Sequence, residues 1–299
     1  MTGKLLHLDA RVSVIIPVWN GQTSIGRCLA SLHRQSYPSD RIQIIVVDNG
    51  STDKTIEVVQ SFEDIILLTE PVESSYRARN LGLDHAKGDI IAFTDADCEV
   101  DPAWIEAGVS AITQNADTAV AAGSVQLIPA HENGYSRAAH LYEEQFAFRQ
   151  DEAARLGHSM TVNWMSPRWV FEKVGKFDPE LKSGGDLELS GRISGAGHCV
   201  RYVPDMVVYH PARSNIAELA AKRRRVTGGM WVREGKRQLF WLVLFLAIEA
   251  AKRSGKVLMA TNYSLGDRLR LIGLLCRLAG IGAGELVRLA FFGGEPRRS

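Results

Sequence analysis

Residues 90–97 read Ile90-Ile91-Ala92-Phe93-Thr94-Asp95-Ala96-Asp97, five apolar or β-branched residues followed by two aspartates around an alanine. The apolar part is typical of a short strand buried in a sheet. If the backbone stays extended, side-chain alternation places Asp95 and Asp97 on the same face. Two buried carboxylates need a positive partner, and a divalent cation carrying a phosphorylated ligand would supply it. An isolated Asp-x-Asp is also compatible with a polar loop, so the surrounding sequence must decide.

Apolar segments of strand length alternate with amphipathic segments through the first half of the chain. Further strands are predicted at 12–18, 42–47, 65–68 and 119–125, with helices between them. Ser51 or Thr52 is expected to cap the helix after the second strand, and Asp101 the helix after residues 90–97. This alternation predicts an α/β fold with a mainly parallel sheet covered on both faces.

Polar residues follow several of these strands directly. Asn20 and Asp48 come after the first two, as Asp95 and Asp97 come after the strand at 90–94. Open α/β sheets bind ligands at the carboxyl ends of their strands. We therefore expect these four side chains to gather at one edge of the sheet.

Charge is distributed unevenly along a chain of 299 residues whose net charge is only +1. Residues 1–212 hold 18 Lys and Arg against 28 Asp and Glu, whereas residues 213–299 hold 17 against 6. A basic C-terminal region on an acidic body favours a polyanionic surface as its partner. The four widely spaced cysteines indicate reduced thiols in a cytosolic protein, and residues 1–10 lack the apolar run of a secretory signal.

Four motifs in this order resemble glycosyltransferase family 2. They are Val12–Asn20, Val46–Asp53, Arg77–Asn80 with Gly82, and Phe93–Asp97. The resemblance is specific over residues 11–100, extends to about residue 215 and is loose in the last 80 or so residues. It implies a GT-A fold, which is Rossmann-like with a mainly parallel mixed sheet, a nucleotide-sugar donor, and inversion at the anomeric carbon.

The resemblance also implies roles for residues at the strand ends. Pro17 and Asn20 would shape the first nucleotide loop. Asp95 would contact the ribose, and Asp97 would bind the metal ion, Mn²⁺ or Mg²⁺.

Asp48 and Arg79 have an implied role and a plainer alternative. Asp48 resembles the carboxylate that accepts a hydrogen bond from the base, but an aspartate here can also start an Asx-turn. Arg79 resembles a cation near the base and phosphate, and its fork suits either group. An exposed helical charge is the alternative for Arg79.

The segment Ser183–Leu189 resembles the Glu-Asp-x-Asp segment that precedes a helix in the family, except that Gly185 stands in place of the glutamate. Asp186 aligns with the general base that takes a proton from the acceptor hydroxyl. Glu188 is the fallback for that role. Asp186 can also cap the helix, and a helix N-terminus would keep its carboxylate ionised, so the two interpretations are compatible.

Three further sites are implied by position in the family. Trp164 either stacks on a sugar ring or belongs to the core. His210 either adds an imidazole ligand to the metal or is structural. Arg224 and Arg225, within a run of four basic residues, either contact the diphosphate or form a solvated or membrane-facing basic face.

Two apolar segments lie in the basic C-terminal region. Residues 238–248 are uncharged but shorter than a spanning helix requires, and residues 269–292 are interrupted by charges. Both suit helices lying on anionic lipid, and both suit helices packed on protein or on a second copy. The basic balance favours the membrane surface.

Together these features predict a catalytic domain at 1–215, with a donor half at 1–125 and an acceptor half at 126–215, and a membrane-associating helical region at 216–299. The predicted function is a metal-dependent inverting glycosyltransferase of cell-surface polysaccharide or glycolipid synthesis, at the inner face of the cell membrane. Its donor would be a nucleotide sugar, with UDP favoured, and its acceptor a saccharide or a lipid-linked hydroxyl. The sequence leaves oligomeric state open, and no aromatic–basic platform indicates nucleic acid.

Two alternatives remain at this point. A sugar nucleotidyltransferase usually carries a basic glycine-rich loop after the first strand, and the loop at Trp19-Asn20-Gly21 has no lysine or arginine. A non-catalytic nucleotide-sugar-binding scaffold is consistent with the glycine at position 185, although Asp95, Asp97 and Asp186 are retained.

Overall fold

The computed structural model describes residues 9–128, 136–213, 215–235 and 238–296. The signal-peptide expectation concerns residues 1–10, and the first eight of these lie outside the described range. The chain divides into two compact units. The sheet unit comprises Met1–Gln126, Phe148–Glu180 and Gly185–His210, and the helical unit comprises Leu127–Ala147, Leu181–Gly184 and Pro211–Ser299.

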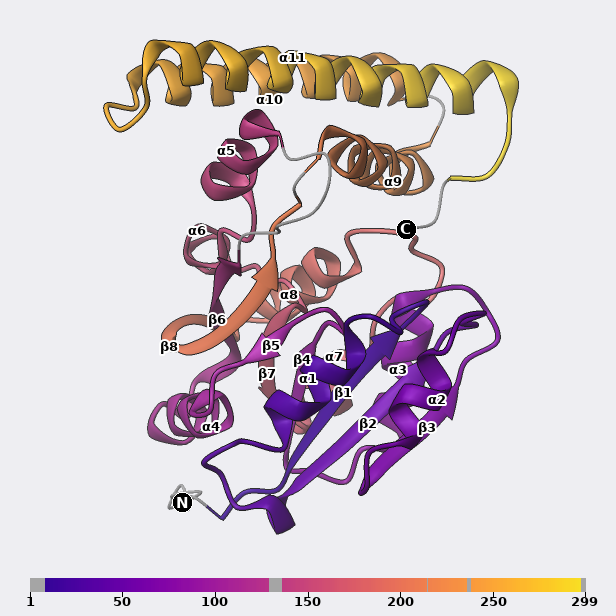
Figure 1. The fold of residues 1–299 in the computed structure, drawn as a ribbon, viewed down its shortest axis with the longest axis vertical. Helices are drawn as coiled ribbons and strands as arrows, with labels where there is room; N and C mark the ends of the chain where they lie inside the picture. Colours follow the sequence, from indigo (N-terminus) through magenta and orange to yellow (C-terminus); the bar gives the residue numbers. More distant parts are fainter. Residues whose placement is uncertain (1–8, 129–135, 214, 236–237, 297–299) are drawn as a thin grey trace. The chain divides into compact units, whose positions relative to one another are not determined.

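In the described part of the chain, eight strands form a single mixed sheet (Figure 1). They are β1 (Val12–Val18), β2 (Ile42–Asp48), β3 (Ile65–Thr69), β4 (Ile90–Thr94), β5 (Glu99–Val100), β6 (Thr118–Ile128), β7 (Asn163–Pro167) and β8 (Cys199–Pro211). Their order is β3-β2-β1-β4-β7-β6-β8-β5. β1 pairs in parallel with β2 and β4, and β2 with β3, whereas β7 runs antiparallel to β4 and β6. The predicted strands and the mainly parallel first half are confirmed.

Two helices of the sheet unit, α2 (Thr55–Gln60) and α4 (Trp104–Gln114), begin later than their predicted caps. The unit also contains α1 (Ile25–Leu32), α3 (Ser75–His85), α6 (Gln150–Arg155), α7 (Trp169–Val174) and α8 (Gly185–Gly195). Neither Ser51 nor Thr52 caps α2, because both bind the loop after β1 instead. Asp101 accepts from the Ala103 N–H at 3.0 Å and so shapes the turn before α4 rather than capping the helix itself.

The core explains why these sequences fold locally as they do. All five residues of β4 are buried, as the run of apolar and β-branched side chains predicts for a central strand. Helix α3 packs on β1 with Gly82 at the contact, where an added Cβ would lie 2.4 Å from Ile15 Cγ2. Glycine therefore allows the backbone of α3 to approach the sheet closely.

The helical unit contains α5 (Arg137–Phe146), α9 (Ile216–Glu234), α10 (Leu239–Met259) and α11 (Leu265–Val287), which a short π-helical turn, η3 (Arg288–Phe292), extends. α10 and α11 pack as a hairpin whose inner side contacts α9 and, through α11, α5 (Figure 1). The apolar segments at 238–248 and 269–292 are thus parts of longer helices. Among the described residues, no helix has both the length and the apolar character needed to cross a bilayer.

Candidate active site

The loops that follow β1 and β2 are hydrogen-bonded to each other. Asn20, in the left-handed region at φ 50°, donates its N–H to Ser51 Oγ at 2.9 Å and accepts the Thr52 N–H on Oδ1 at 2.8 Å. Pro17 lies in β1, opposite Val47 of β2. These bonds fix one continuous rim at the carboxyl edge of the sheet.

Asp48 is buried at the end of β2 and turns its carboxylate onto its own loop. It accepts the Gly50 N–H at 3.1 Å and the Ser51 N–H at 3.2 Å. The Asx-type turn is therefore present. A carboxylate offers about four acceptor positions, so two backbone bonds leave capacity for the N–H of a base.

Arg79 is not an exposed helical charge, because only 5% of its surface is accessible. Its Nη2 binds Asp95 Oδ1 at 2.7 Å, and its Nη1 donates to the Ser75 carbonyl at 3.4 Å. Among the described residues its Nε has no acceptor. A buried donor without a partner is costly, so this guanidinium has an unused N–H that an anionic or carbonyl ligand would satisfy.

Asp95 and Asp97 lie in a turn rather than on an extended strand. The Cys98 N–H donates to the Asp95 carbonyl at 3.1 Å, which closes this turn directly after Thr94. The expectation that strand alternation places both carboxylates on one face is therefore wrong. The turn instead gives each a separate partner: Asp95 pairs with Arg79, and Asp97 lies beside His210.

Asp97, Cys98 and His210 form a cluster whose ligand-type atoms lie within 4.8 Å of one another. The His210 Nε2 is 3.6 Å from Asp97 Oδ2, and Phe148 packs on the imidazole with ring centroids 4.4 Å apart. Burial and the neighbouring Asp97 raise the pKa of the Cys98 thiol well above its usual range. Among the three side chains, the carboxylate oxygen of Asp97 and the imidazole nitrogen of His210 are the donors that suit Mn²⁺, whereas a thiol suits softer metals.

Asp186 is the second residue of α8 and accepts the Leu187 N–H at 3.0 Å. Burial raises the pKa of its carboxyl above the ordinary aspartate value. That N–H and the charge of Arg79 oppose the rise, and Asp95 adds to it. Asp186 is therefore electrostatically coupled to the Arg79–Asp95 pair.

Glu188, the fallback base, is occupied by an arginine of its own helix. Arg192 binds both carboxylate oxygens, with Nε at 2.5 Å and Nη2 at 3.0 Å. The same guanidinium donates to the carbonyls of Val174 and Lys176 at 2.6 Å. Glu188 thus helps to hold α8 against the segment after α7, which favours Asp186 as the base.

Tyr76 has a role that no sequence pattern indicated. Its hydroxyl accepts the Gly185 N–H at 2.8 Å, and its ring stacks on Phe177 with centroids 5.7 Å apart. A Cβ at position 185 would lie 2.8 Å from Tyr76 Cζ. The tyrosine therefore fills the space that a side chain at 185 would need, which accounts for the glycine in the segment. No local pattern relates residues 76 and 185, so only the fold reveals their contact.

Gly185→Ala is expected to lower the free energy of unfolding by about 1–3 kcal/mol, because the new methyl group meets the Tyr76 ring. Urea denaturation of wild type and variant measures the change. Gly195→Ala is the matched control at the other end of α8, since a Cβ there meets nothing within 4 Å. Tyr76→Ala alone should also destabilise the fold, but in that background Gly185→Ala should cost much less than in the wild type, because the ring that the methyl group meets is gone. Equal losses at 185 and 195 would contradict steric exclusion.

Trp164 is a core residue of the sheet unit. It is fully buried in β7, donates its indole N–H to Ser166 Oγ at 2.7 Å and meets Phe93 edge-on at 6.5 Å between centroids. The prediction that it stacks on a sugar ring is wrong, and its place in the core is the alternative that holds. Its strand is central in the sheet, so both faces are covered.

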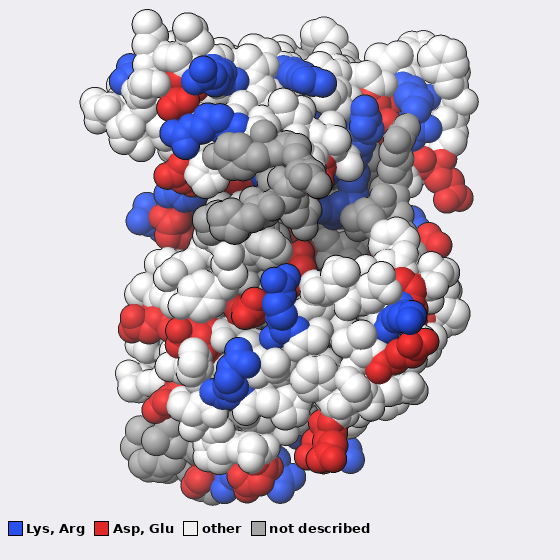
Figure 2. All heavy atoms as spheres, in the orientation of Figure 1, with Lys and Arg blue, Asp and Glu red and all other residues white. Residues whose placement is uncertain are grey.

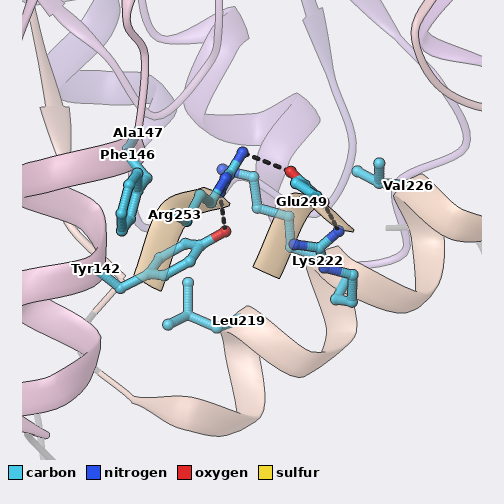
Figure 3. Close-up of a pocket in the computed structure, with 9 residues that line it drawn as sticks. Tyr142, Phe146, Ala147, Leu219, Lys222, Val226, Glu249 and Arg253 are labelled. Carbon is cyan, nitrogen blue, oxygen red and sulfur yellow. Dashed lines mark hydrogen bonds and ion pairs between the residues drawn. The ribbon is translucent and has the colours of Figure 1, made fainter. Parts of the chain in front are cut away.

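The basic run of α9 belongs to the helical unit. Arg253 binds Glu249 at 2.6 Å (Figure 3), and Arg223 Nη1 binds the same carboxylate at 3.0 Å. Lys222 lies 3.8 Å from buried Glu143. A cavity of about 170 Å³ is lined by Lys222, Arg223, Glu249 and Arg253 together with Tyr142, Phe146 and Leu219. Burial lowers the pKa of Lys222 to about 8. Arg224 and Arg225 are partly buried on the same helix, and their contact with a diphosphate stays a prediction.

Comparison with known proteins identifies the family. The profile described as "Glycosyl transferase family 2" matches residues 13–175, more than half of the chain. "Glycosyltransferase AglE" of Haloferax volcanii is 32% identical over 290 residues, which cover 90% of this chain and 93% of AglE. The chain belongs to glycosyltransferase family 2. A "Pre-mycofactocin glycosyltransferase" of Mycobacterium tuberculosis is 30% identical to this glycosyltransferase over 226 residues, 73% of this chain and 46% of that one.

Solved structures confirm that this glycosyltransferase has the GT-A fold. The mannosyltransferase PcManGT from Pyrobaculum calidifontis, in complex with GDP-Man and Mn²⁺, aligns with a TM-score of 0.55 at 21% identity, over 96% of this chain and 77% of that chain. TarS of S. aureus, in complex with UDP-GlcNAc, aligns with a TM-score of 0.53 at 17% identity, over 93% of this chain and 83% of that chain.

Proposed function

We propose that this glycosyltransferase is a metal-dependent inverting enzyme that uses a nucleotide-sugar donor, with UDP favoured. One observation carries the proposal: His210 Nε2 lies 3.6 Å from Asp97 Oδ2, and Asp97 stands two residues after Asp95, the partner of Arg79. Both charges of the Arg79–Asp95 pair act on the carboxyl of Asp186. Donor complexes of the two structural neighbours, with GDP-Man and UDP-GlcNAc, support a nucleotide sugar.

The residues present fit a divalent ion. Asp97 and His210 would hold it, as a carboxylate and an imidazole suit Mn²⁺, or Mg²⁺ with more water in its shell. Bound there, the ion supplies positive charge that stabilises the diphosphate leaving group. PcManGT, whose structure contains Mn²⁺, supports this choice.

The chain's own residues perform the remaining tasks. Asp48 accepts a hydrogen bond from the base, Asn20 shapes the nucleotide-binding loop after β1, and Asp95 contacts the ribose. Arg79 offers its spare N–H to the phosphate or the base edge. Asp186 takes the proton of the acceptor hydroxyl, whose oxygen bonds to the anomeric carbon from the face opposite the diphosphate as the carbon–oxygen bond to the diphosphate breaks.

As pH falls, activity should be lost at a higher pH than if the general base were an exposed aspartate. The pKa of Asp186 is raised by burial, so the base form is lost early as pH falls. Arg79 opposes this rise, so Arg79→Gln should move the acidic limb of kcat/KM further up in pH. A pH–rate profile of both proteins tests this; an unshifted limb would mean that another group sets it.

The acceptor and the cellular role complete the proposal. We propose a hydroxyl of a saccharide or lipid-linked acceptor in cell-surface polysaccharide or glycolipid synthesis. A relative from Methanococcus voltae, 21% identical over 258 residues, is named as a dolichyl phosphate-sugar glucuronosyltransferase, which supports a lipid-linked acceptor. Residues 1–215 would act as the catalytic domain, and residues 216–299 would associate with the inner face of the cell membrane.

Calorimetry against a panel of nucleoside diphosphates, with and without Mn²⁺, tests the donor. We expect Mn²⁺-dependent binding, strongest for UDP, followed by turnover of the matching UDP-sugars. Binding without any turnover or donor hydrolysis would favour a non-catalytic sensor instead. Release of pyrophosphate from a nucleoside triphosphate and a sugar phosphate would indicate a nucleotidyltransferase.

A further inference from the structure

The outer face of the α10–α11 hairpin is apolar and exposed. On α10, Phe240, Trp241 and Phe245 are 69%, 61% and 52% accessible, and Ile248, Leu258 and Met259 continue the same side of the helix. These residues lie opposite Leu242, Leu246 and Val257, which are buried. α10 is thus apolar on both sides, and only one side is covered by protein.

α11 extends this face. Leu265, Leu269, Val287 and Phe291 of α11 and η3 are exposed, whereas Leu271, Leu275 and Leu286 turn inward. The two helices run antiparallel, since Leu286 packs with Leu242 and Leu246. The exposed phenylalanines of η3, Phe291 and Phe292, are therefore at the same end as the exposed aromatic residues of α10.

Exposed cations are interspersed with these apolar residues. Lys252, Lys256, Arg270 and Arg277 are exposed on the two helices, and Lys and Arg side chains alternate with uncharged surface along the α11 edge in Figure 2. The region 239–292, all of it described, contains three carboxylates, and each is already bound to arginine. Glu249 binds Arg223 and Arg253, Asp267 binds Arg137 and Arg270, and Glu285 binds Arg288.

We propose that this face, defined as the outer side of α10, α11 and η3, binds the surface of a membrane that contains anionic lipid. Aromatic and aliphatic side chains would enter the interface, where Trp and Phe are favoured, and the cations would contact phosphate head groups. A second copy of the chain fits less well. A two-fold contact would bring the same cations together with no available carboxylate between them. The inference deepens the proposed function, on which its biological role rests.

Flotation of the full chain with vesicles tests the proposal. The protein should bind vesicles of phosphatidylcholine mixed with phosphatidylglycerol, and bind pure phosphatidylcholine much more weakly. Lys252→Gln with Arg277→Gln should reduce partitioning by about 25-fold, at about fivefold for each cation. Trp241→Ser with Phe245→Ser should reduce it at least about tenfold. Leu156→Ser with Arg34→Gln is the matched control, because both residues are exposed in the sheet unit.

Cys276 offers a second readout that does not depend on activity. Its thiol is exposed on α11, whereas Cys28 and Cys98 are buried. With Cys199→Ser in the background, a polarity-sensitive dye on Cys276 should shift to the blue when anionic vesicles are added. No shift and no flotation would overturn the proposal. A dimer that the Trp241 and Phe245 substitutions dissociate, without vesicle binding, would assign the face to a second copy.

Failure of this surface and failure of the enzyme can be distinguished. If vesicles bind but no nucleotide sugar is turned over, the lipid-binding face stands and the proposed function does not. If the surface variants and the wild type glycosylate a soluble acceptor equally well and neither binds vesicles, the proposed function stands and the lipid-binding face does not.

Discussion

Asp186→Asn is expected to reduce kcat by about 10³-fold, because a positioned general base contributes about 10²–10⁴-fold. The substitution preserves shape and the acceptor for the Leu187 N–H while removing the capacity to take a proton. The acceptor hydroxyl would then have to lose its proton to water. Donor affinity should change little, since the carboxylate is coupled to the donor-side charges but is assigned no donor contact.

A stability measurement on Asp186→Asn shows whether lost activity comes from loss of the base or from unfolding. Burial raises the pKa of Asp186 in the folded state, so ionising it costs stability as pH rises through that pKa. At neutral pH the amide avoids this cost, and Asp186→Asn should be at least as stable as the wild type. A thermal unfolding scan together with nucleoside diphosphate calorimetry checks both points.

Glu188→Gln provides the internal comparison. Its carboxylate is bound by Arg192, so its loss should lower stability and weaken the attachment of α8. We expect Glu188→Gln to reduce kcat by a much smaller factor than Asp186→Asn does. If Glu188→Gln is the more damaging to kcat at equal folded fraction, the base is Glu188 and the assignment here is wrong.

The sequence allowed the sheet to be predicted because its signals are local. Strands such as β1 and β4 are short apolar runs bounded by polar turns, and each lies where the pattern predicts. The ligand edge followed from topology, since parallel strands end together. Helix starts were less accurate, because Ser51 and Thr52 bind the loop at Asn20 rather than the first turn of α2.

The site required contacts between distant residues. The sugar-stacking role of Trp164 was wrong because a position shared with the family does not reveal that both faces of β7 are covered. The Asp95–Asp97 prediction placed the residues correctly but with the wrong geometry, since alternation fails once Cys98 closes a turn. The contact between Tyr76 and Gly185 had no local signal.

Asp97→Asn is expected to weaken Mn²⁺ binding by at least about 100-fold and to abolish transfer. Changes in groups that merely support a metal ligand cost about 10–100-fold in affinity, and loss of a charged ligand should cost more. Mn²⁺ titration by electron paramagnetic resonance, without donor, measures the ion directly. Removal of metal by a chelator should likewise stop transfer by the wild type, with recovery on adding Mn²⁺.

The 3.6 Å separation of Asp97 and His210 has a competing explanation, a simple ion pair between the two side chains. If the two side chains only form an ion pair, Asp97→Asn should lower the stability of the protein and leave Mn²⁺ affinity unchanged. If they form a cation site, Asp97→Asn should lower Mn²⁺ affinity and leave the stability of the metal-free protein largely unchanged. His210→Gln should weaken Mn²⁺ less than Asp97→Asn, because a neutral ligand is replaced by a neutral one. Cys98→Ser is the control: its protonated thiol is a poor ligand for a hard ion, so Mn²⁺ affinity should be retained. If Cys98→Ser weakens binding as strongly as Asp97→Asn, the site prefers a softer metal than Mn²⁺.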